Sequence, residues 1–147
     1  LVFAALTLIA AINICFANRT YLKLHLEYEN AYSLATTLVT QIRSLPGYDE
    51  NDRVALYPSA GEALAFAPEF GDEDETDHDI MGVQFQLLTG YNEREFITRY
   101  IGAQLPFLSR EEAAALALDE RCQQMPVYPN DGSIQMIDDV VFVKFAP

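Results

Sequence analysis

The chain has 147 residues and carries 22 Asp and Glu residues against 9 Lys and Arg, so its formal net charge is −13. This length is typical of one domain, and an apolar fraction of 50% is enough for a buried core and excludes a disordered chain. The acidic balance disfavours nucleic acid as a partner, and two cysteines cannot form a disulfide scaffold.

Residues 1–17 (LVFAALTLIAAINICFA) form an apolar segment without a charged side chain, and the first charge is Arg19. A membrane-spanning helix needs about 20 apolar residues, so this segment reaches the lower limit. Tyrosines and cations follow it, which is typical of a membrane interface. We therefore expect a transmembrane helix over residues 1–18. The chain starts at Leu1 without methionine, so it is either a fragment or a processed product. We expect this helix to be the last span of a larger protein.

Two other interpretations of the apolar segment remain open. Cys15-Phe16-Ala17 offers a small-x-small cleavage site for a signal peptide, although no basic region precedes it. A helix buried in a soluble core would have a similar composition. A lipoprotein-type Cys15 is disfavoured, because the residues before it are not small. The residues alone do not decide sidedness, since positive-inside counting also needs the loop before the span.

A long amphipathic helix is predicted after the apolar segment. Apolar residues recur at helical spacing from Tyr21 to Leu45, and no breaker separates this stripe from the apolar residues before it. The two parts therefore predict one continuous helix of about 40 residues, roughly 60 Å long. Pro46 and Gly47 end it, because proline cannot continue the ladder and glycine tolerates the exit geometry.

Four shorter segments follow. Residues 53–57 (RVALY) are typical of a short buried strand, and residues 80–85 (IMGVQF) predict another, weakened by Gly82. Residues 62–70 are expected to be irregular. Residues 71–79 (GDEDETDHD) predict an acidic surface loop, because such a run repels itself.

Two short helices are predicted next. Asn92 is a good N-cap for a helix that runs to about Ile101. Ser109-Arg110-Glu111-Glu112 has the spacing of a capping box, and an alanine-rich helix follows it to Gln124.

The end of the chain predicts a β-hairpin, because residues 133–137 and 140–145 alternate in polarity around Asp138-Asp139. The elements together predict an α/β (α+β) fold. In it, an N-terminal transmembrane helix continues into a long amphipathic helix, which packs with a small sheet of about three strands and two short helices. Residues 19–147 are expected to form one domain, since no repeat or linker divides them.

The polar residues predict neither a metal site nor a cofactor. An EF-hand counted from Asp72 needs glycine and glutamate at positions that hold Asp77 and Val83, so the acidic run is better interpreted as a solvated loop. His25 and His78 lack the close partners of a zinc site. The phosphate-loop, dinucleotide-binding and nucleophile-elbow motifs are absent from the sequence.

The two cysteines are not expected to meet. Cys15 lies in the apolar segment, and Cys122 lies near the end of a short helix, where we expect a packed thiol. Asn18-Arg19-Thr20 spells a glycosylation sequon, but it lies at the membrane edge and we interpret it as a chance match.

Residues 125–134 (MPVYPNDGSI) form the most distinctive stretch. Two prolines flank Tyr128 and stiffen an extended segment, which then turns. One interpretation is a rigid connection from helix to strand, and the other is a ledge that presents Tyr128 and Asp131 to a sugar. Lys144 on the last strand similarly suits either a solvated position or a cation that steers a phosphate.

Residues 125–134 together with residues 137–145 (IDDVVFVKF) resemble the C-terminal end of the Gtr-type O-antigen glucosyltransferases, a family of polytopic bacterial inner-membrane proteins. Residues 21–48 (YLKLHLEYENAYSLATTLVTQIRSLPGY) resemble the helix that leads from their final span into an extracytoplasmic domain, and residues 80–85 and 94–106 fit less specifically. The family's Asp-Gly hairpin turn is Asp138-Asp139 here.

The resemblance implies a transferase that moves a glucosyl residue from a polyprenyl-phosphate donor to O-antigen or another cell-surface polysaccharide. It implies that residues after about 18 lie in the periplasm, and that the catalytic acid lies in an earlier loop outside this chain. The implied partners are the lipid bilayer, the lipid-linked sugar and the polysaccharide acceptor. Tyr128, Asp131 and Lys144 are the candidate substrate-binding residues. The alternative is a non-catalytic, membrane-anchored extracytoplasmic binding or assembly domain.

Overall fold

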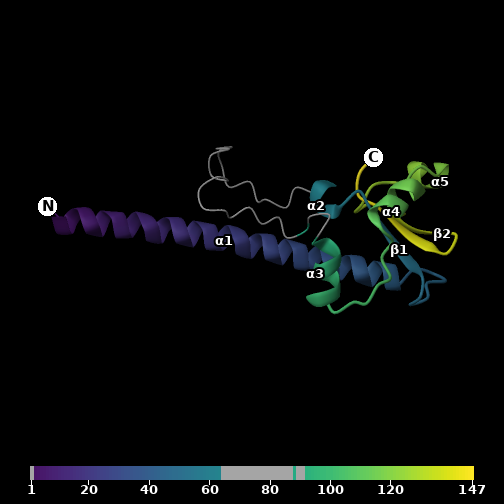
Figure 1. Cartoon of the computed structure of the whole chain (residues 1–147), viewed down its shortest axis with the longest axis horizontal. Helices are drawn as coiled ribbons and strands as arrows, with labels where there is room; N and C mark the ends of the chain where they lie inside the picture. The colour runs from purple at the N-terminus through teal and green to yellow at the C-terminus, as the bar shows by residue number, and fades with distance from the viewer. Residues whose placement is uncertain (1, 64–87, 89–91) are drawn as a thin grey trace.

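The computed structural model of the chain describes residues 2–63, 88 and 92–147 (Figure 1). In chain order the elements are α1 (Val2–Arg43), β1 (Arg53–Tyr57), α2 (Ala60–Ala63), α3 (Glu93–Arg99), α4 (Arg110–Leu116), α5 (Glu120–Gln124), β2 (Ile134–Ile137) and β3 (Val140–Lys144). These elements confirm the predicted α+β fold. The expected acidic loop and the strand over residues 80–85 lie outside the described residues. Residues 64–70 of the segment expected to be irregular also lie outside the described residues. Its first two residues, 62 and 63, are the last two residues of α2.

Helix α1 is a single uninterrupted helix of 42 residues, about 63 Å long at 1.5 Å per residue. It contains neither proline nor glycine, which explains why the apolar and amphipathic parts are continuous. Residues 2–19 are all exposed, whereas one stripe of its C-terminal part is buried. Five side chains form that stripe: Ala31, Ala35, Leu38, Val39 and Ile42. Figure 1 shows the domain gathered around this end of α1 while the N-terminal end projects away.

The sheet has three strands in the order β1-β3-β2. Strand β3 lies in the centre, parallel to β1 and antiparallel to β2, with Ala55 opposite Phe142 and Met136 opposite Val141. The predicted hairpin is confirmed, and Asp138 in its turn takes a left-handed φ of 53°. The predicted buried strand over residues 53–57 is also confirmed.

The side chains of the sheet point alternately to two apolar clusters, because successive residues of a strand face opposite sides. Val54 and Leu56 join the cluster that contains the buried stripe of α1 and the buried side of α3. Ala55 and Phe142 join the second cluster, which contains Ala113 of α4 and members from α5 and its flanks. Helices α1 and α3 therefore cover one face of the sheet, and α4 and α5 cover the other.

The helix termini confirm one predicted cap and correct one predicted helix. The capping box forms, because the Glu112 N–H donates to Ser109 Oγ at 3.2 Å and the Ser109 N–H donates to Glu112 Oε2 at 2.9 Å. Asn92 occupies the N-cap position of α3 but its side chain makes no capping hydrogen bond. The single helix predicted from Ser109 to Gln124 is wrong. It breaks into α4 and α5, because Asp119 adopts extended backbone and its Oδ1 accepts the Arg121 N–H at 2.8 Å, which starts a new helix.

Candidate functional site

The distinctive segment over residues 125–134 connects α5 to β2 and runs along the end of β3. The Tyr128 N–H donates to the Lys144 carbonyl at 2.8 Å, and the Lys144 N–H donates to the Ser133 carbonyl at 3.0 Å. The Tyr128-Pro129 peptide bond is cis. These backbone bonds bring two of the candidate residues, Tyr128 and Lys144, side by side.

The Tyr128 side chain belongs to the core. It is only 8% exposed, and its ring packs edge to face against Phe145 with 5.5 Å between ring centroids. Burial raises the pKa of its phenol. The geometry gives Tyr128 a packing role and makes the segment a rigid connection between helix and strand. A role for this ring at a sugar remains a prediction.

The Lys144 ammonium binds the end of α5. Its Nζ donates to the carbonyls of Gln123 at 2.7 Å and Met125 at 3.1 Å. The last carbonyls of a helix lack partners within the helix and carry its partial negative charge, so a cation here stabilises the terminus. An ammonium has three N–H donors, and two of them are used in this way.

Asp131 lies at the solvent edge of the same segment, where it is exposed. The turn around it is held locally, because Asn130 Nδ2 donates to the Val127 carbonyl at 2.7 Å and Gly132 adopts a φ of +84°. A side chain at position 132 would be strained at that φ. Of the three candidate residues, Asp131 is therefore the one that the fold leaves freely presented to a ligand.

Arg121 pairs with one of the two aspartates in the hairpin turn, Asp138. Its Nη2 lies 2.8 Å from Asp119 Oδ2 and 3.0 Å from Asp138 Oδ2, so it bridges the start of α5 to the turn. Hydrogen bonds from Arg121 lower the pKa of both carboxyls. Asp138 thus has a structural partner, whereas the residue that departs from the expected Asp-Gly turn is Asp139.

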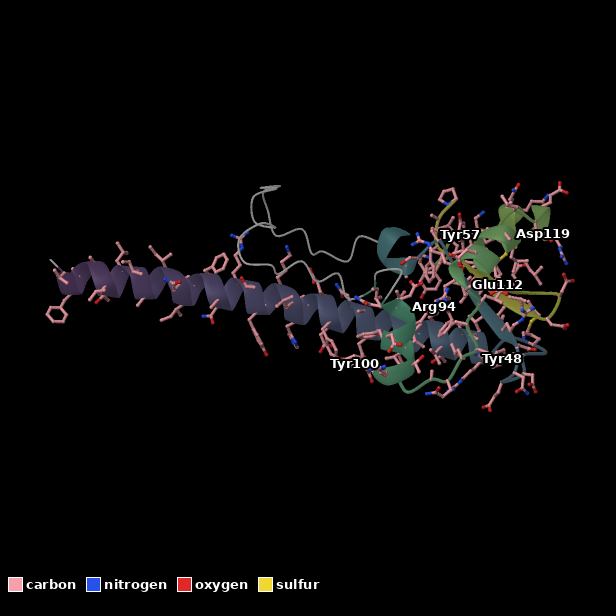
Figure 2. The ribbon with its side chains drawn as sticks, viewed as in Figure 1. Tyr48, Tyr57, Arg94, Tyr100, Glu112 and Asp119 are labelled. Carbon is pink, nitrogen blue, oxygen red and sulfur yellow. The ribbon has the colours of Figure 1, made fainter. Side chains whose placement is uncertain are left out.

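Glu93 is a buried polar residue that the sequence reasoning missed. Its Oε2 accepts the Ala60 N–H at 2.9 Å and the Ser59 hydroxyl at 3.2 Å, so α3 supplies the acceptor at the start of α2. The guanidinium of the neighbouring Arg94 lies 5.9 Å from the centroid of the Phe107 ring. Figure 2 labels Arg94 near α3. Acidic residues in a first helical turn are ordinary, and nothing local to the sequence indicates a partner 33 residues away.

The cysteines confirm the expectation that they do not pair. Both are free, with Cys15 exposed on α1 and Cys122 on the buried side of α5. Burial raises the pKa of the Cys122 thiol, which makes it less reactive. Among the described residues there is no group of three or more His, Cys, Asp or Glu side chains that could hold a metal ion.

Helix α1 is the one helix of the described part that is long and apolar enough to cross a membrane, with a mean hydropathy of 1.7 in its most apolar window and none of that window buried. The protein is thus a small α+β domain carried on a helix that suits a bilayer by length and composition. No protein-family model, curated protein or solved structure matches the chain.

Proposed function

We propose that this chain is the terminal, membrane-anchored domain of a glycosyltransferase that moves a glucosyl residue from a polyprenyl-phosphate donor to O-antigen or another cell-surface polysaccharide. The observation that carries the proposal is the division of α1, whose apolar residues 2–17 are exposed while its last turns build the domain core. An exposed apolar surface of this size needs a second apolar phase to cover it, and a bilayer provides one.

The orientation follows from the resemblance of residues 21–48 and 125–145 to the Gtr-type glucosyltransferases. In this proposal residues 2–18 span the bacterial inner membrane and the domain lies in the periplasm. The donor phosphate stays at the membrane surface, and the catalytic acid comes from an earlier loop of the same protein. The domain then binds the acceptor or closes the site from above.

The position of the domain on α1 agrees with that role. The first buried residue of α1, Ala31, lies 14 residues beyond Ala17, so the core begins about 21 Å past the apolar segment along the helix axis. The polar layer of one leaflet is about 5–8 Å thick. In this proposal the buried part of α1 therefore begins beyond the lipid headgroups, at a height where a polysaccharide is accessible.

The alternative, a non-catalytic binding or assembly domain, is favoured by one observation. The Tyr128 ring packs in the core, and Lys144 already binds two helix carbonyls, so both candidates have structural partners. An experiment must therefore separate chemistry from packing.

The test is glucosyl transfer in membranes that contain the whole protein, with a radiolabelled polyprenyl-phosphate donor. Asp131→Asn and Lys144→Met remove charge while keeping size, and Tyr128→Phe removes only the hydroxyl. We expect Asp131→Asn or Lys144→Met to lower transfer without lowering the amount of protein in the membrane. Asp139→Asn, on the exposed turn at the other end of β2, is the control. Wild-type transfer in all three variants would favour the assembly domain, and a protein that transfers no sugar at all would overturn the proposal.

A further inference from the structure

The two edges of the sheet differ in what lies beside them. On the β1 edge, the Val54 N–H donates to the Pro106 carbonyl at 3.0 Å, and the Leu108 N–H donates to the Val54 carbonyl at 2.9 Å. An extended segment of the chain is thus added to β1, through a parallel bridge between Val54 and Phe107. Strand β2 is the other edge, because the strand order is β1-β3-β2.

The register of the hairpin determines which backbone groups of β2 point outward. In an antiparallel pair, residues that bond the partner strand alternate with residues whose N–H and C=O point away from it. The Lys144 N–H donates to the Ser133 carbonyl at 3.0 Å, so these two residues form a bonded pair. Two residues further along β2, Gln135 therefore also bonds β3. The N–H and C=O groups of Ile134 and Met136 consequently point away from β3, and we call them the open edge.

The open edge has no hydrogen-bond partner within residues 2–63, 88 and 92–147. No hydrogen bond outside the β2–β3 ladder involves the backbone of Ile134 or Met136 there. Residues 134–137 (IQMI) also lack the charge, proline or bulge that often protects an edge strand. Two N–H donors and two carbonyl acceptors at a spacing of two residues match the backbone of one further strand. Their chemistry therefore selects an extended peptide.

The side chains of β2 define the sequence that suits an added strand. Ile134 and Met136 are partly buried and pack against the cluster between α1 and the sheet. Gln135 points to the opposite side and is exposed. Residues opposite one another in paired strands lie on the same side of the sheet. An added strand therefore places apolar residues beside Ile134 and Met136 and polar residues beside Gln135.

The charges at the ends of β2 favour a basic partner. Residues 119–144 carry five carboxylates and two cations. Both cations are already bound, because Arg121 pairs with two of these carboxylates and the Lys144 ammonium donates to two backbone carbonyls. Asp131 before β2 and Asp139 after it are exposed, and neither forms an ion pair in the described part of the chain. A cation at each end of an added strand would complement them.

The same two carboxylates oppose pairing of β2 with a second copy of itself. A two-fold pairing would join the outward groups of Ile134 to those of Met136 in the copy. That register brings the end of β2 that carries Asp131 to the end that carries Asp139 in the copy, twice in the dimer. Like charges that face each other across paired strands are destabilising, so the occupant is a different protein.

We propose that the open edge of β2 binds an extended segment of another protein, with apolar residues at alternate positions and Lys or Arg at both ends. The segment adds a fourth strand to the three-stranded sheet through the N–H and C=O groups of Ile134 and Met136. Its cations meet Asp131 and Asp139. The inference goes beyond the proposed function and does not depend on it, because it needs neither a membrane nor a sugar.

The test is a fluorescence-anisotropy titration of the full chain in detergent with a labelled heptapeptide, KVTVTVK, as the probe. Met136→Pro removes an outward N–H and leaves the ladder to β3 intact, so we expect it to weaken binding about tenfold. Asp131→Asn and Asp139→Asn should each weaken binding about twofold at low salt. Gln135→Thr changes an exposed side chain of the same strand and keeps its backbone groups, so it is the control with unchanged affinity.

Amide hydrogen exchange of the wild type is a second measurement, and it does not require a variant to fold. The Ile134 and Met136 N–H groups should exchange fast in the free chain, because they point to solvent. Saturating KVTVTVK should protect both of them and leave the Gln135 N–H unchanged, because that group already bonds β3. Protection of every second amide distinguishes strand addition from other modes of binding.

Three results would overturn the inference: no binding of KVTVTVK, binding without protection of the Ile134 and Met136 amides, or equal affinity for the acidic peptide EVTVTVE. Protection that rises with protein concentration in the absence of peptide would identify a second copy as the occupant, and would also overturn the basic partner. The titration contains no sugar donor or acceptor, so its failure leaves the proposed transferase intact, and a failed transfer assay leaves the open edge intact.

Discussion

Ile42→Ala tests whether α1 is part of the domain core. Ile42 lies on the last turn of α1, is fully buried and packs in the cluster between α1 and the sheet. The substitution removes three buried carbon atoms, which at about 0.8 kcal/mol each gives about 2.4 kcal/mol, and the remaining cavity adds to this. Because large-to-small core changes cost about 2–5 kcal/mol, we expect a loss of about 3 kcal/mol in the free energy of unfolding.

The assay is thermal unfolding of the full chain in detergent, followed by near-ultraviolet circular dichroism of the tyrosines. A loss of this size in a domain of this length lowers Tm by about 10 °C. Gln41→Ala is the matched control, because Gln41 is the exposed neighbour on the same turn and such changes stay within about 0.5 kcal/mol. An equal Tm for Ile42→Ala and Gln41→Ala would refute the docking of α1 on the sheet.

Three further predictions concern a cap, a thiol and a phenol. Ser109→Ala should cost about 1 kcal/mol of stability in denaturant titrations, and more than Asn92→Ala, because only Ser109 makes its capping bond. In a Cys15→Ala background, a maleimide should modify Cys122 only as fast as the domain unfolds, and immediate labelling would contradict its burial. Burial raises the pKa of Tyr128 in the folded protein. The phenol of the unfolded chain therefore ionises at a lower pH, above about pH 10. The free energy of unfolding is unaffected below that pH and falls as the pH rises further. Tyr128→Phe should reduce this loss of stability at high pH. If the free energy of unfolding fell equally with pH in the wild type and in Tyr128→Phe, the burial of Tyr128 would not be its cause.

The elements that the sequence predicted correctly depend on local patterns. The uninterrupted α1 follows from helical spacing without a breaker, and the hairpin follows from alternation around Asp138-Asp139. The capping box at Ser109 needs only residues three apart. Even the break in the second predicted helix has a local sign, because Asp119 followed by Glu120 is a good start for a new helix.

The remaining features depend on contacts between distant parts of the chain. The parallel pairing of β1 with β3 joins Arg53 to Val140, and no local pattern encodes that partner. The candidate site shows the same limit. The two prolines predict a stiff segment at Tyr128, but only the position of Phe145 determines that the ring turns inward. Likewise, the partners of Lys144 become known only when α5 is placed beside β3.

The unbroken length of α1 has a mechanical consequence. From Ala17 to Arg43 the helix extends about 39 Å without a hinge residue, and the domain is packed on its far end. Transmembrane helices tilt by about 20° on average and adjust their tilt to the thickness of the bilayer. A change in tilt of about 10° would swing the domain sideways by about 7 Å as a rigid lever. In the proposed arrangement, with residues 2–18 spanning a membrane, bilayer thickness would therefore help to set the position of the domain over the membrane surface.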